Sequence, residues 1–230
     1  LDEVYGQLRM NDINNTSVKI ICTHCGLDVG EDGKTHQCID YISLSSNLYN
    51  SKLIIPADAN QADRIIRYAA MVPGNIIVAM GRSKLPVLQK EDGSVFFDRE
   101  YTFEYGKADW IRKGNHGTII TYGTMVYKAV NACEKLKKMG FSFGILNISC
   151  PLALDTQKLY EAAETGLIVT YEDHNIRTGI GSIVGAFIAE EGLKCNFKRM
   201  GIREYGVSAS PAYQFREKSL DEDSLVDLLC

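Results

Sequence analysis

Short apolar runs rich in valine and isoleucine recur along the chain and alternate with segments whose apolar residues repeat at helical spacing. Runs of roughly four to eight such residues are typical of buried strands. Strands that alternate with helices predict an α/β fold built on a parallel sheet with crossover helices. The strands are expected at residues 18–22, 52–55, 75–80, 118–122, 143–148, 167–171 and 195–200.

Three segments between these strands have the features of amphipathic helices. The first begins at Asp58, which forms a capping box with Gln61, and closes at a proline. The second carries an apolar stripe over residues 126–136, with lysines near its C-terminal end. The third covers residues 180–192.

The pattern changes at residues 89–110, where a polar stretch precedes aromatic residues that partly alternate with charged ones. This segment indicates a linker with short exposed strands between a first block, residues 1–88, and a second, residues 111–230. The first block holds only three predicted strands and opens with a helix-like segment at residues 1–9. Because such a sheet makes a poor independent core, the block is expected to be the latter half of a domain, with an open edge that recruits a partner.

The composition and net charge of the chain disfavour several classes of binding partner. The 230 residues are 45% hydrophobic and 23% charged, as in ordinary globular proteins, and the formal net charge is −4. An acidic balance disfavours nucleic acid and anionic membranes as the main partner, since both bind clustered Lys and Arg. The apolar stretches fall far short of the roughly 20 residues that span a bilayer. Seven cysteines, mostly within apolar runs, fit free thiols in a reducing cytosol.

The first residue is Leu1, not Met. The chain is therefore expected either to be processed or to be part of something larger.

Candidate chemistry gathers in two loops. In doubly wound α/β proteins, ligands bind beyond the carboxyl ends of the parallel strands. His24 stands just beyond the strand predicted at 18–22, and Arg82 just beyond the strand at 75–80. The two residues are therefore expected above one edge of a single sheet.

The first of these loops adds Lys34 and His36, which together with His24 and Arg82 form a small basic cluster on an acidic protein. Such a cluster suits a phosphate, because a guanidinium group can hold it through two hydrogen bonds. The neighbouring Asp32 adds an acceptor for a hydroxyl group. Donors for phosphate beside an acceptor for hydroxyl favour a sugar phosphate over a nucleic acid.

The residues also carry a family resemblance. The loop at residues 23–37, with its Gly-Glu-Asp-Gly-Lys-Thr-His-Gln ending, and the Pro-Ala-Asp-Ala segment at 56–59 resemble the pyrimidine-binding domain of transketolases. The Thr-Tyr-Gly segment at 121–123, the Glu-Asp-His-Asn segment at 172–175 and the glycines at 179, 181 and 185 resemble the transketolase C-terminal domain. The similarity covers essentially the whole chain and is best to the separate C-terminal subunit of two-part transketolases.

This resemblance implies a partial thiamine-diphosphate pyrimidine-binding fold, followed by a C-terminal α/β domain with a mostly parallel five-stranded sheet. It also separates the chain from related enzymes. The 1-deoxyxylulose-5-phosphate synthases usually place Arg where His24 stands. The beta chains of 2-oxoacid dehydrogenases share the fold but lack the loop.

Carried over residue by residue, the resemblance implies that His24 and Arg82 bind the substrate phosphate and that Asp32 bonds a substrate hydroxyl near C2. His36 would be the catalytic residue beside the reacting carbon, because an imidazole can donate and accept a proton near neutrality. The implied reaction transfers a two-carbon ketol unit from a ketose phosphate to an aldose phosphate. It belongs to the pentose phosphate pathway of carbohydrate metabolism, in the cytoplasm.

The resemblance further implies thiamine diphosphate with Mg²⁺ as the cofactor. The chain starts just after the glutamate that activates this cofactor in the family and the aromatic residues that hold its pyrimidine. Cofactor-binding residues are therefore expected upstream of Leu1, and the diphosphate and metal sites in a separate N-terminal domain or subunit. No metal ligand is assigned here, the chain alone is not expected to turn over, and a homodimer or a dimer of heterodimers is expected.

Other interpretations of the same residues are weaker. Cys22 and Cys25 with His36 and Cys38 could be zinc ligands, but Cys22 belongs to an apolar strand and His-x-Cys is an unusual ligand spacing. The glycines between residues 179 and 185 imitate a dinucleotide motif, but no strand ends directly before them, which favours close helix packing.

His174 is expected to be a structural or interface hydrogen-bonding group, and His116 a loop residue. Two rival functions stay open. One is another thiamine-dependent transferase, such as a 1-deoxyxylulose-5-phosphate synthase. The other is a non-catalytic module that binds sugar phosphate or serves in assembly.

Overall fold

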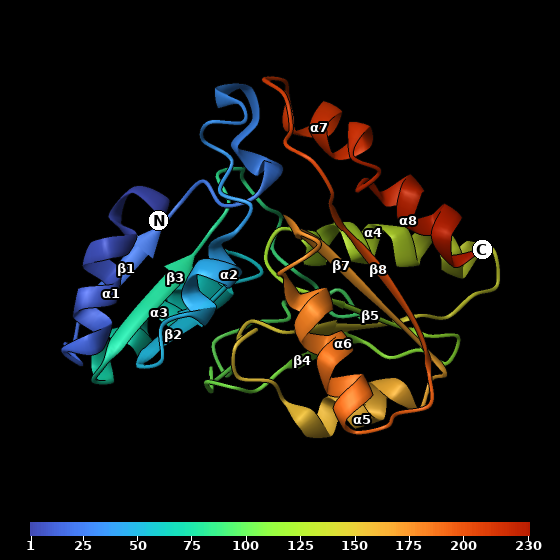
Figure 1. The fold of residues 1–230 in the computed structure, drawn as a ribbon. Coiled ribbons are helices and arrows are strands. Elements are labelled where there is room, and N and C mark those ends of the chain that lie inside the picture. Colours follow the sequence, from blue (N-terminus) through green and yellow to red (C-terminus); the bar gives the residue numbers. More distant parts are fainter.

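The computed structural model describes all 230 residues, which form two β-sheets lying side by side (Figure 1). The first sheet has three strands in the order β1-β3-β2, and the second has five in the order β4-β6-β5-β7-β8. The α/β fold expected from the alternating pattern is confirmed, including the mostly parallel five-stranded sheet.

The first sheet is entirely parallel. Its strands are β1 (Lys19–Cys22), β2 (Ser51–Ile54) and β3 (Asn75–Ala79). β3 lies in the middle, and all five of its residues are buried. β1 lies at an edge with no strand on its outer side, and its residue Ile21 is 47% exposed. The open edge predicted for the first block is therefore present.

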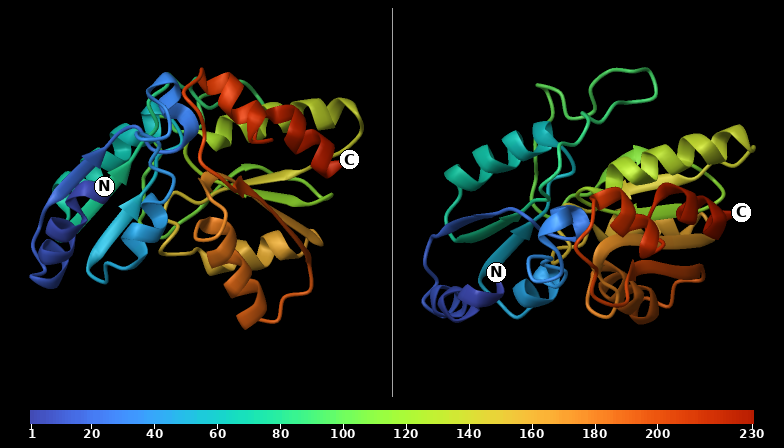
Figure 2. Two further views of the ribbon diagram at one scale, coloured as in Figure 1. Left: turned by 45° about the horizontal axis from the view of Figure 1, so that its top comes forward. Right: turned by 90° about the horizontal axis from the view of Figure 1, so that it is seen from above.

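Helices cover both faces of this small sheet. They are α1 (Tyr5–Ile13), which follows a 3₁₀ turn at Asp2–Val4, α2 (Tyr41–Ser46) and α3 (Ala59–Met71). α1 and α2 lie on one face and α3 on the other (Figure 2). Neighbouring strand residues alternate between the faces: Leu53 and Ile77 belong to the cluster on the α1 and α2 side, whereas Ile54 and Ile76 pack with Ile65 of α3.

The start of α3 follows the predicted capping pattern. Asp58 Oδ1 accepts a hydrogen bond from the Gln61 backbone N–H at 2.8 Å, and Gln61 Oε1 accepts one from the Ala57 N–H at 2.7 Å. The other oxygen of Asp58 accepts from the Leu88 N–H at 2.9 Å. The same carboxylate thus caps the helix and fixes the chain as it leaves the first sheet.

The second sheet contains β4 (Asp109–Arg112), β5 (Thr118–Thr121), β6 (Gly144–Asn147), β7 (Leu167–Asn175) and β8 (Asn196–Ile202). β4 is the antiparallel edge strand, paired with β6, and it begins within the segment 89–110 that was expected to be a linker. Its four residues contain no apolar run, so the sequence pattern did not separate them from the linker. The other strands lie at their predicted places, and β7 continues four residues beyond its predicted end.

Five helices cover the second sheet: α4 (Met125–Lys138), α5 (Thr156–Ala163), α6 (Ile180–Glu190), α7 (Pro211–Glu217) and α8 (Glu222–Leu229). α4, α7 and α8 lie on one face, and α5 and α6 on the other (Figure 1). α4 and α6 confirm two predicted helices, whereas the short helices α2, α5, α7 and α8 were not predicted. None of the helices is both long and apolar enough to cross a membrane.

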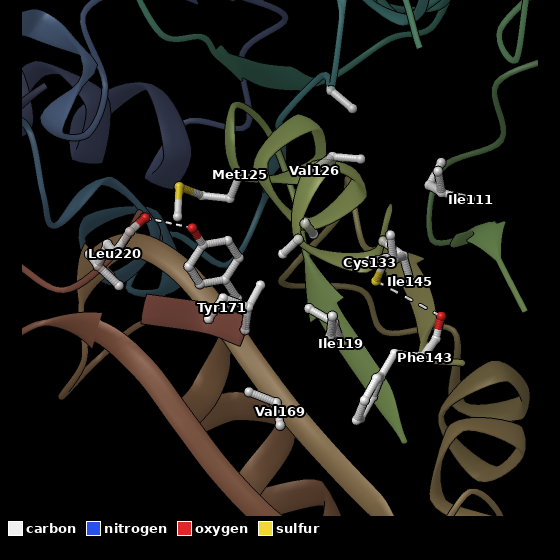
Figure 3. Packing of buried hydrophobic residues seen from close by; sticks show 14 of the residues in the cluster. Ile111, Ile119, Met125, Val126, Cys133, Phe143, Ile145, Val169, Tyr171 and Leu220 are labelled. Carbon is white, nitrogen blue, oxygen red and sulfur yellow. Dashed lines mark hydrogen bonds between the residues drawn. The ribbon is translucent and has the colours of Figure 1, made fainter. Parts of the chain in front are cut away.

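Figure 3 shows the core between the second sheet and α4, where Ile119 and Val169 from neighbouring strands face Val126 of the helix. Tyr171, fully buried on β7, donates its hydroxyl hydrogen bond to the carbonyl of Leu220. This bond ties the segment between α7 and α8 to the centre of the sheet.

One apolar cluster runs from the first sheet to the second. Tyr41 and Ile55 on the first side pack with Tyr122 and Ile148 on the second. The rings of Tyr41 and Tyr122 meet edge to face with 6.4 Å between centroids. The backbone N–H of Ile55 donates to the Ser149 carbonyl at 2.8 Å across the same junction. The two sheets therefore share one packed body.

Candidate functional site

The loop that follows β1, residues 25–38, is called the histidine loop below. It carries 3₁₀ turns over Leu27–Asp32, interrupted at Gly30, whose φ is +69°. A Cβ at Gly30 would come within 3.1 Å of Pro211 on α7. Glycine is needed here both for the left-handed backbone and for the close approach of the C-terminal segment.

Two buried glutamines hold the histidine loop against that segment. Gln37 Nε2 donates to Gln214 Oε1 at 2.6 Å, and Gln214 Nε2 donates to the Gly30 carbonyl at 2.8 Å. Gln37 Oε1 accepts from the Gly206 N–H at 3.1 Å. Each amide oxygen and nitrogen in this network has a partner, which offsets the cost of burying the groups. Gln214 had no sequence signal, because a single polar residue in the C-terminal segment reveals nothing about a partner so far away in the chain.

Arg82 and Asp32 meet at the carboxyl edge of the first sheet, as the strand-end argument predicts for Arg82. Arg82 Nη1 donates to Asp32 Oδ2 at 3.0 Å and to the Val29 carbonyl at 2.9 Å. The two side chains are 45% and 40% exposed. The Nε and Nη2 groups of Arg82 and the Oδ1 atom of Asp32 make no hydrogen bond within the chain. The pair is therefore held in place but keeps free donors and a free acceptor that face solvent.

The two histidines of the predicted cluster stand apart from that pair. His24 Nδ1 shares a hydrogen bond with the Thr23 hydroxyl at 2.8 Å, and His36 Nδ1 shares one with the Thr35 hydroxyl at 3.0 Å. Neither ring bonds Arg82 or Asp32, and Lys34 is exposed on the same loop. The structure joins Arg82 to Asp32 directly, while the histidines keep their Nε2 atoms free of partners within the chain.

A buried acidic junction lies beneath the histidine loop. Asp173 on β7 accepts hydrogen bonds from the Thr124 hydroxyl at 3.1 Å and the Tyr41 hydroxyl at 3.4 Å. Asp28 of the loop accepts from the Ser83 N–H at 2.6 Å. Burial raises the pKa of Asp173 to about 7, and the nearby carboxylate of Asp28 contributes to the rise.

Gly26 is the residue at which the histidine loop packs against Asp173. Its φ is +77°, and a Cβ there would lie 1.9 Å from Asp173 Oδ2. No side chain fits between the loop and Asp173, so glycine sets how closely the first sheet approaches the second. The Asp28 and Asp173 pair was not predicted as part of the site, because the two residues come together only through tertiary packing.

Glu172, also on β7, receives the first backbone N–H groups of α6. Its carboxylate accepts from the Ile180 N–H at 2.7 Å, the Gly181 N–H at 3.0 Å and the Tyr122 hydroxyl at 3.2 Å. Burial raises the pKa of Glu172 to about 8, and these three donors oppose the rise. A Cβ at Gly179 would lie 2.0 Å from Glu172 Oε2. The glycines therefore serve close packing, as expected, and the helix N-terminus is occupied by the chain's own carboxylate.

His174 has the structural role expected of it. Its Nε2 accepts a hydrogen bond from the Ile42 N–H at 3.1 Å, and its Nδ1 donates to the Asn175 carbonyl at 3.1 Å. Burial lowers the pKa of His174 to about 4, so the ring is neutral at pH 7. It links α2 of the first block to β7 of the second.

The possible zinc ligands do not converge. Among the His, Cys, Asp and Glu side chains, only Asp2, Cys38 and Asp40 place three ligand atoms within 4.8 Å of one another. Cys22, Cys25 and His36 lie outside this group, so the set of four ligands considered from the sequence is not assembled.

The hollow beside Arg82 measures about 430 Å³ and is lined by Pro56, Asp58, Met80, Ser83 and Lys84 among others. It contains no aromatic ring, and both oxygens of its one carboxylate, that of Asp58, are already bonded to backbone N–H groups. The expectation that the cofactor-binding residues lie upstream of Leu1 stays a prediction.

The buried carboxyl of Asp173 predicts a pH-dependent stability. Its pKa is about 7 in the folded chain against 3.8 as a free side chain, so the native state holds the proton over that interval and loses stability as the pH rises through it. Each unit of difference between the pKa values of the folded and unfolded states corresponds to about 1.4 kcal/mol of stability. Asparagine cannot titrate. As the pH is raised from 5 to 7.5, we therefore expect the free energy of unfolding of the wild type to fall by roughly 1–3 kcal/mol relative to that of Asp173→Asn.

Urea denaturation at both pH values measures this difference. Glu172 and His174 also titrate and remain in both proteins. Because the charge of Asp173 contributes to the raised pKa of Glu172, the difference reports Asp173 together with its effect on Glu172. Asp227→Asn, an exposed substitution on α8, serves as the control and should show no such trend. A wild-type-minus-variant difference that is independent of pH would rule out a buried titrating carboxyl at position 173.

Comparison with known proteins agrees with this architecture. The transketolase pyrimidine-binding domain family matches residues 1–87, and the transketolase C-terminal domain family matches residues 106–225. An apulose-4-phosphate transketolase subunit of Actinobacillus succinogenes is 30% identical over 218 residues, which are 94% of this chain and 68% of that protein. A putative transketolase C-terminal section from Methanocaldococcus jannaschii is 32% identical over 210 residues, 91% of this chain and 64% of the relative.

The solved structure of a split-gene transketolase, an inactive beta4 tetramer, superposes with a TM-score of 0.83 at 26% identity, covering 98% of this chain and 72% of the other. Mouse transketolase is 25% identical over 227 residues, so the chain spans only 35% of that longer relative. Two families match in the same order as the two sheets, and three of these relatives are named as a transketolase subunit, a C-terminal section and a split-gene transketolase. The chain thus belongs to the transketolase family and corresponds to its C-terminal section.

Proposed function

We propose that this chain, joined to an N-terminal part, transfers a two-carbon ketol unit from a ketose phosphate to an aldose phosphate. The observation that carries the proposal is the Arg82 and Asp32 pair at the carboxyl edge of the first sheet. Asp32 and the Val29 carbonyl orient the guanidinium through Nη1, which leaves Nε and Nη2 for the oxygens of a phosphate. The Oδ1 atom of Asp32 remains available to a sugar hydroxyl.

In the proposed reaction, each binding or proton-transfer step is assigned to a side chain. Arg82 and His24 bind the phosphate of the substrate, and Asp32 orients a hydroxyl near C2. His36, exposed with a free Nε2, moves a proton to and from the substrate oxygen at the reacting carbon. Thiamine diphosphate, the cofactor of the family, supplies the carbon–carbon bond chemistry. In this proposal it is held together with Mg²⁺ by the N-terminal part.

The open edge of the first sheet supports the need for that part. β1 has no strand on its outer side, and Val18, Ile21 and Ile13 beside it are 38%, 47% and 62% exposed. Unpaired strand edges with apolar residues recruit partners. The relative from Actinobacillus succinogenes is itself one subunit of a transketolase, and the tetramer of beta chains in the split-gene structure is inactive. We propose that the active form is a dimer of heterodimers.

A donor panel tests the function. The chain is assayed alone and together with the N-terminal part from the same source, with thiamine diphosphate and Mg²⁺, using ketose phosphates and pyruvate as donors. We expect turnover only in the mixture and only with ketose phosphates. Turnover of pyruvate would favour a 1-deoxyxylulose-5-phosphate synthase. A stable complex without turnover of any donor would favour an assembly module.

Arg82→Ala should impair the use of phosphorylated donors specifically. Loss of a charge-assisted bidentate contact is expected to lower kcat/KM for a ketose phosphate by roughly 10- to 100-fold. The value for the unphosphorylated ketose should change little, because that donor makes no contact with the guanidinium. Arg67→Ala is the matched control, since Arg67 is a 73% exposed arginine on α3 that pairs only with Asp63. Equal losses on both donors would remove Arg82 from phosphate recognition.

His36→Ala should lower kcat of the assembled enzyme by roughly 10²- to 10⁴-fold, the usual contribution of general acid–base help. Gel filtration with the N-terminal part shows whether assembly is intact. His116→Gln is the control, because His116 precedes the N-terminal end of β5 and its ring accepts a hydrogen bond only from the Ser142 N–H. A near-wild-type kcat in an intact complex would show that His36 has no part in proton transfer.

A further inference from the structure

The two ends of the histidine loop are cysteines that lie side by side. Cys25 and Cys38 are partners in an isolated parallel β-bridge. The Gly26 N–H donates to the Cys38 carbonyl at 2.8 Å, and the Cys25 N–H donates to the Met80 carbonyl at 3.0 Å. These bonds draw the two ends of the loop together at the carboxyl edge of the first sheet. The 12 residues between them include Asp32 and His36.

The spacing suits a covalent link. Neighbouring strands lie about 4.7–4.9 Å apart, and disulfides form when the Cα atoms are about 4.4–6.8 Å apart. The β-bridge brings the two thiols near each other, and their interaction raises the pKa of Cys25 and lowers that of Cys38. Cys38 is half-buried and reachable from solvent, whereas Cys25 is only 4% exposed.

We propose that Cys25 and Cys38 are a redox pair whose disulfide closes the neck of the histidine loop, formed by exchange with a small, uncharged disulfide. The Cys38 thiolate attacks one sulfur of the small disulfide and expels the first thiol, which leaves a mixed disulfide on Cys38. Cys25 then attacks the Cys38 sulfur and expels the second thiol. Two protein thiols are oxidised, one small disulfide is reduced to two thiols, and these take up the two cysteine protons.

The charge around Cys38 selects the oxidant. Its Sγ lies 3.8 Å from Asp40 Oδ1, and the carboxylate of Asp2 belongs to the same group within 4.8 Å. The amino group of Leu1 is the one cation that acts on the same thiol, so the surroundings keep a net negative charge. Two carboxylates beside the attacking sulfur repel an anionic disulfide such as oxidised glutathione. An uncharged or cationic disulfide meets no such repulsion, so it should react faster.

The other five thiols lack this arrangement. Cys133 and Cys150 are buried in clusters of the protein core, and neither Cys195 nor Cys230 is paired with another cysteine in a β-bridge. Cys22 precedes the loop on β1 and is the competitor, because its thiol is near enough to influence both members of the pair. The test must therefore show whether Cys38 is linked to Cys25 or to Cys22.

The experiment treats the whole chain with bis(2-hydroxyethyl) disulfide, blocks the remaining thiols and maps the disulfide by mass spectrometry. Trypsin cuts after Lys19, Lys34 and Lys52, which places Cys38 alone in peptide 35–52 and Cys22 with Cys25 in peptide 20–34. We expect these two peptides to be linked in the wild type and equally in Cys22→Ser. The link should be lost in Cys25→Ser and in Cys38→Ser, and dithiothreitol should release it.

Stability provides a second readout, which does not depend on the enzymatic proposal. Closing a ring of 14 residues restricts the unfolded chain, so the melting temperature of Cys22→Ser should rise on oxidation by about 5–10 °C. Cys38→Ser treated in the same way should show no rise. Oxidised glutathione should form the link at least several-fold more slowly than the uncharged disulfide.

A link from Cys22 to Cys38 in place of the Cys25 link, or free Cys25 and Cys38 after oxidation of folded wild-type chain, would overturn the proposal. The mapping of Cys22→Ser decides the matter even if the buried Cys25→Ser variant fails to fold, because Cys25 is then the only cysteine of peptide 20–34.

Discussion

The hydrogen bonds between Gln37, Gln214 and the Gly30 carbonyl are the constraint on which the candidate site depends. The histidine loop begins and ends at the first sheet, but its middle is held by α7 of the C-terminal domain. That domain supplies none of the predicted substrate-binding residues. Its contribution is to fix the loop from which Asp32 reaches Arg82, so the geometry of the pair depends on both sheets at once.

The junction between the sheets combines a continuous apolar cluster with buried acids. Tyr41, Ile55 and Tyr122 supply the packing, while Asp173 and Glu172 lie directly beneath and beside it on β7. Each carboxyl group is surrounded by hydroxyl or backbone N–H donors, which offsets part of the cost of its burial. Gly26 and Gly179 leave room for these carboxylates, because a single Cβ would displace either one. The Glu-Asp-His-Asn segment noted in the sequence is therefore mainly an element of the domain junction.

The periodicity of the sequence predicted the strands and helices whose own residues carry a clear apolar pattern. Seven strands and the three helices with clear apolar stripes were found at their places, because each carries its own hydrophobic signal. β4 and the short helices α2, α5, α7 and α8 were missed, since four to eight residues are too few to show a period. The strand-end rule placed Arg82 at the sheet edge. Its contact with Asp32 could not be predicted, because it depends on the turn at Gly30 and on a glutamine 184 residues further along.

That distance along the chain has a consequence for synthesis. The histidine loop leaves the ribosome long before Gln214, which holds it and lies 184 residues after Gly30. All three strands of the small sheet have been made once β3 emerges, but the loop beyond them has no support until α7 is complete. Contacts between residues so far apart in the sequence form late in folding, because the chain loses entropy when it brings the two segments together. A nascent chain cut short before α7 would therefore lack an ordered histidine loop.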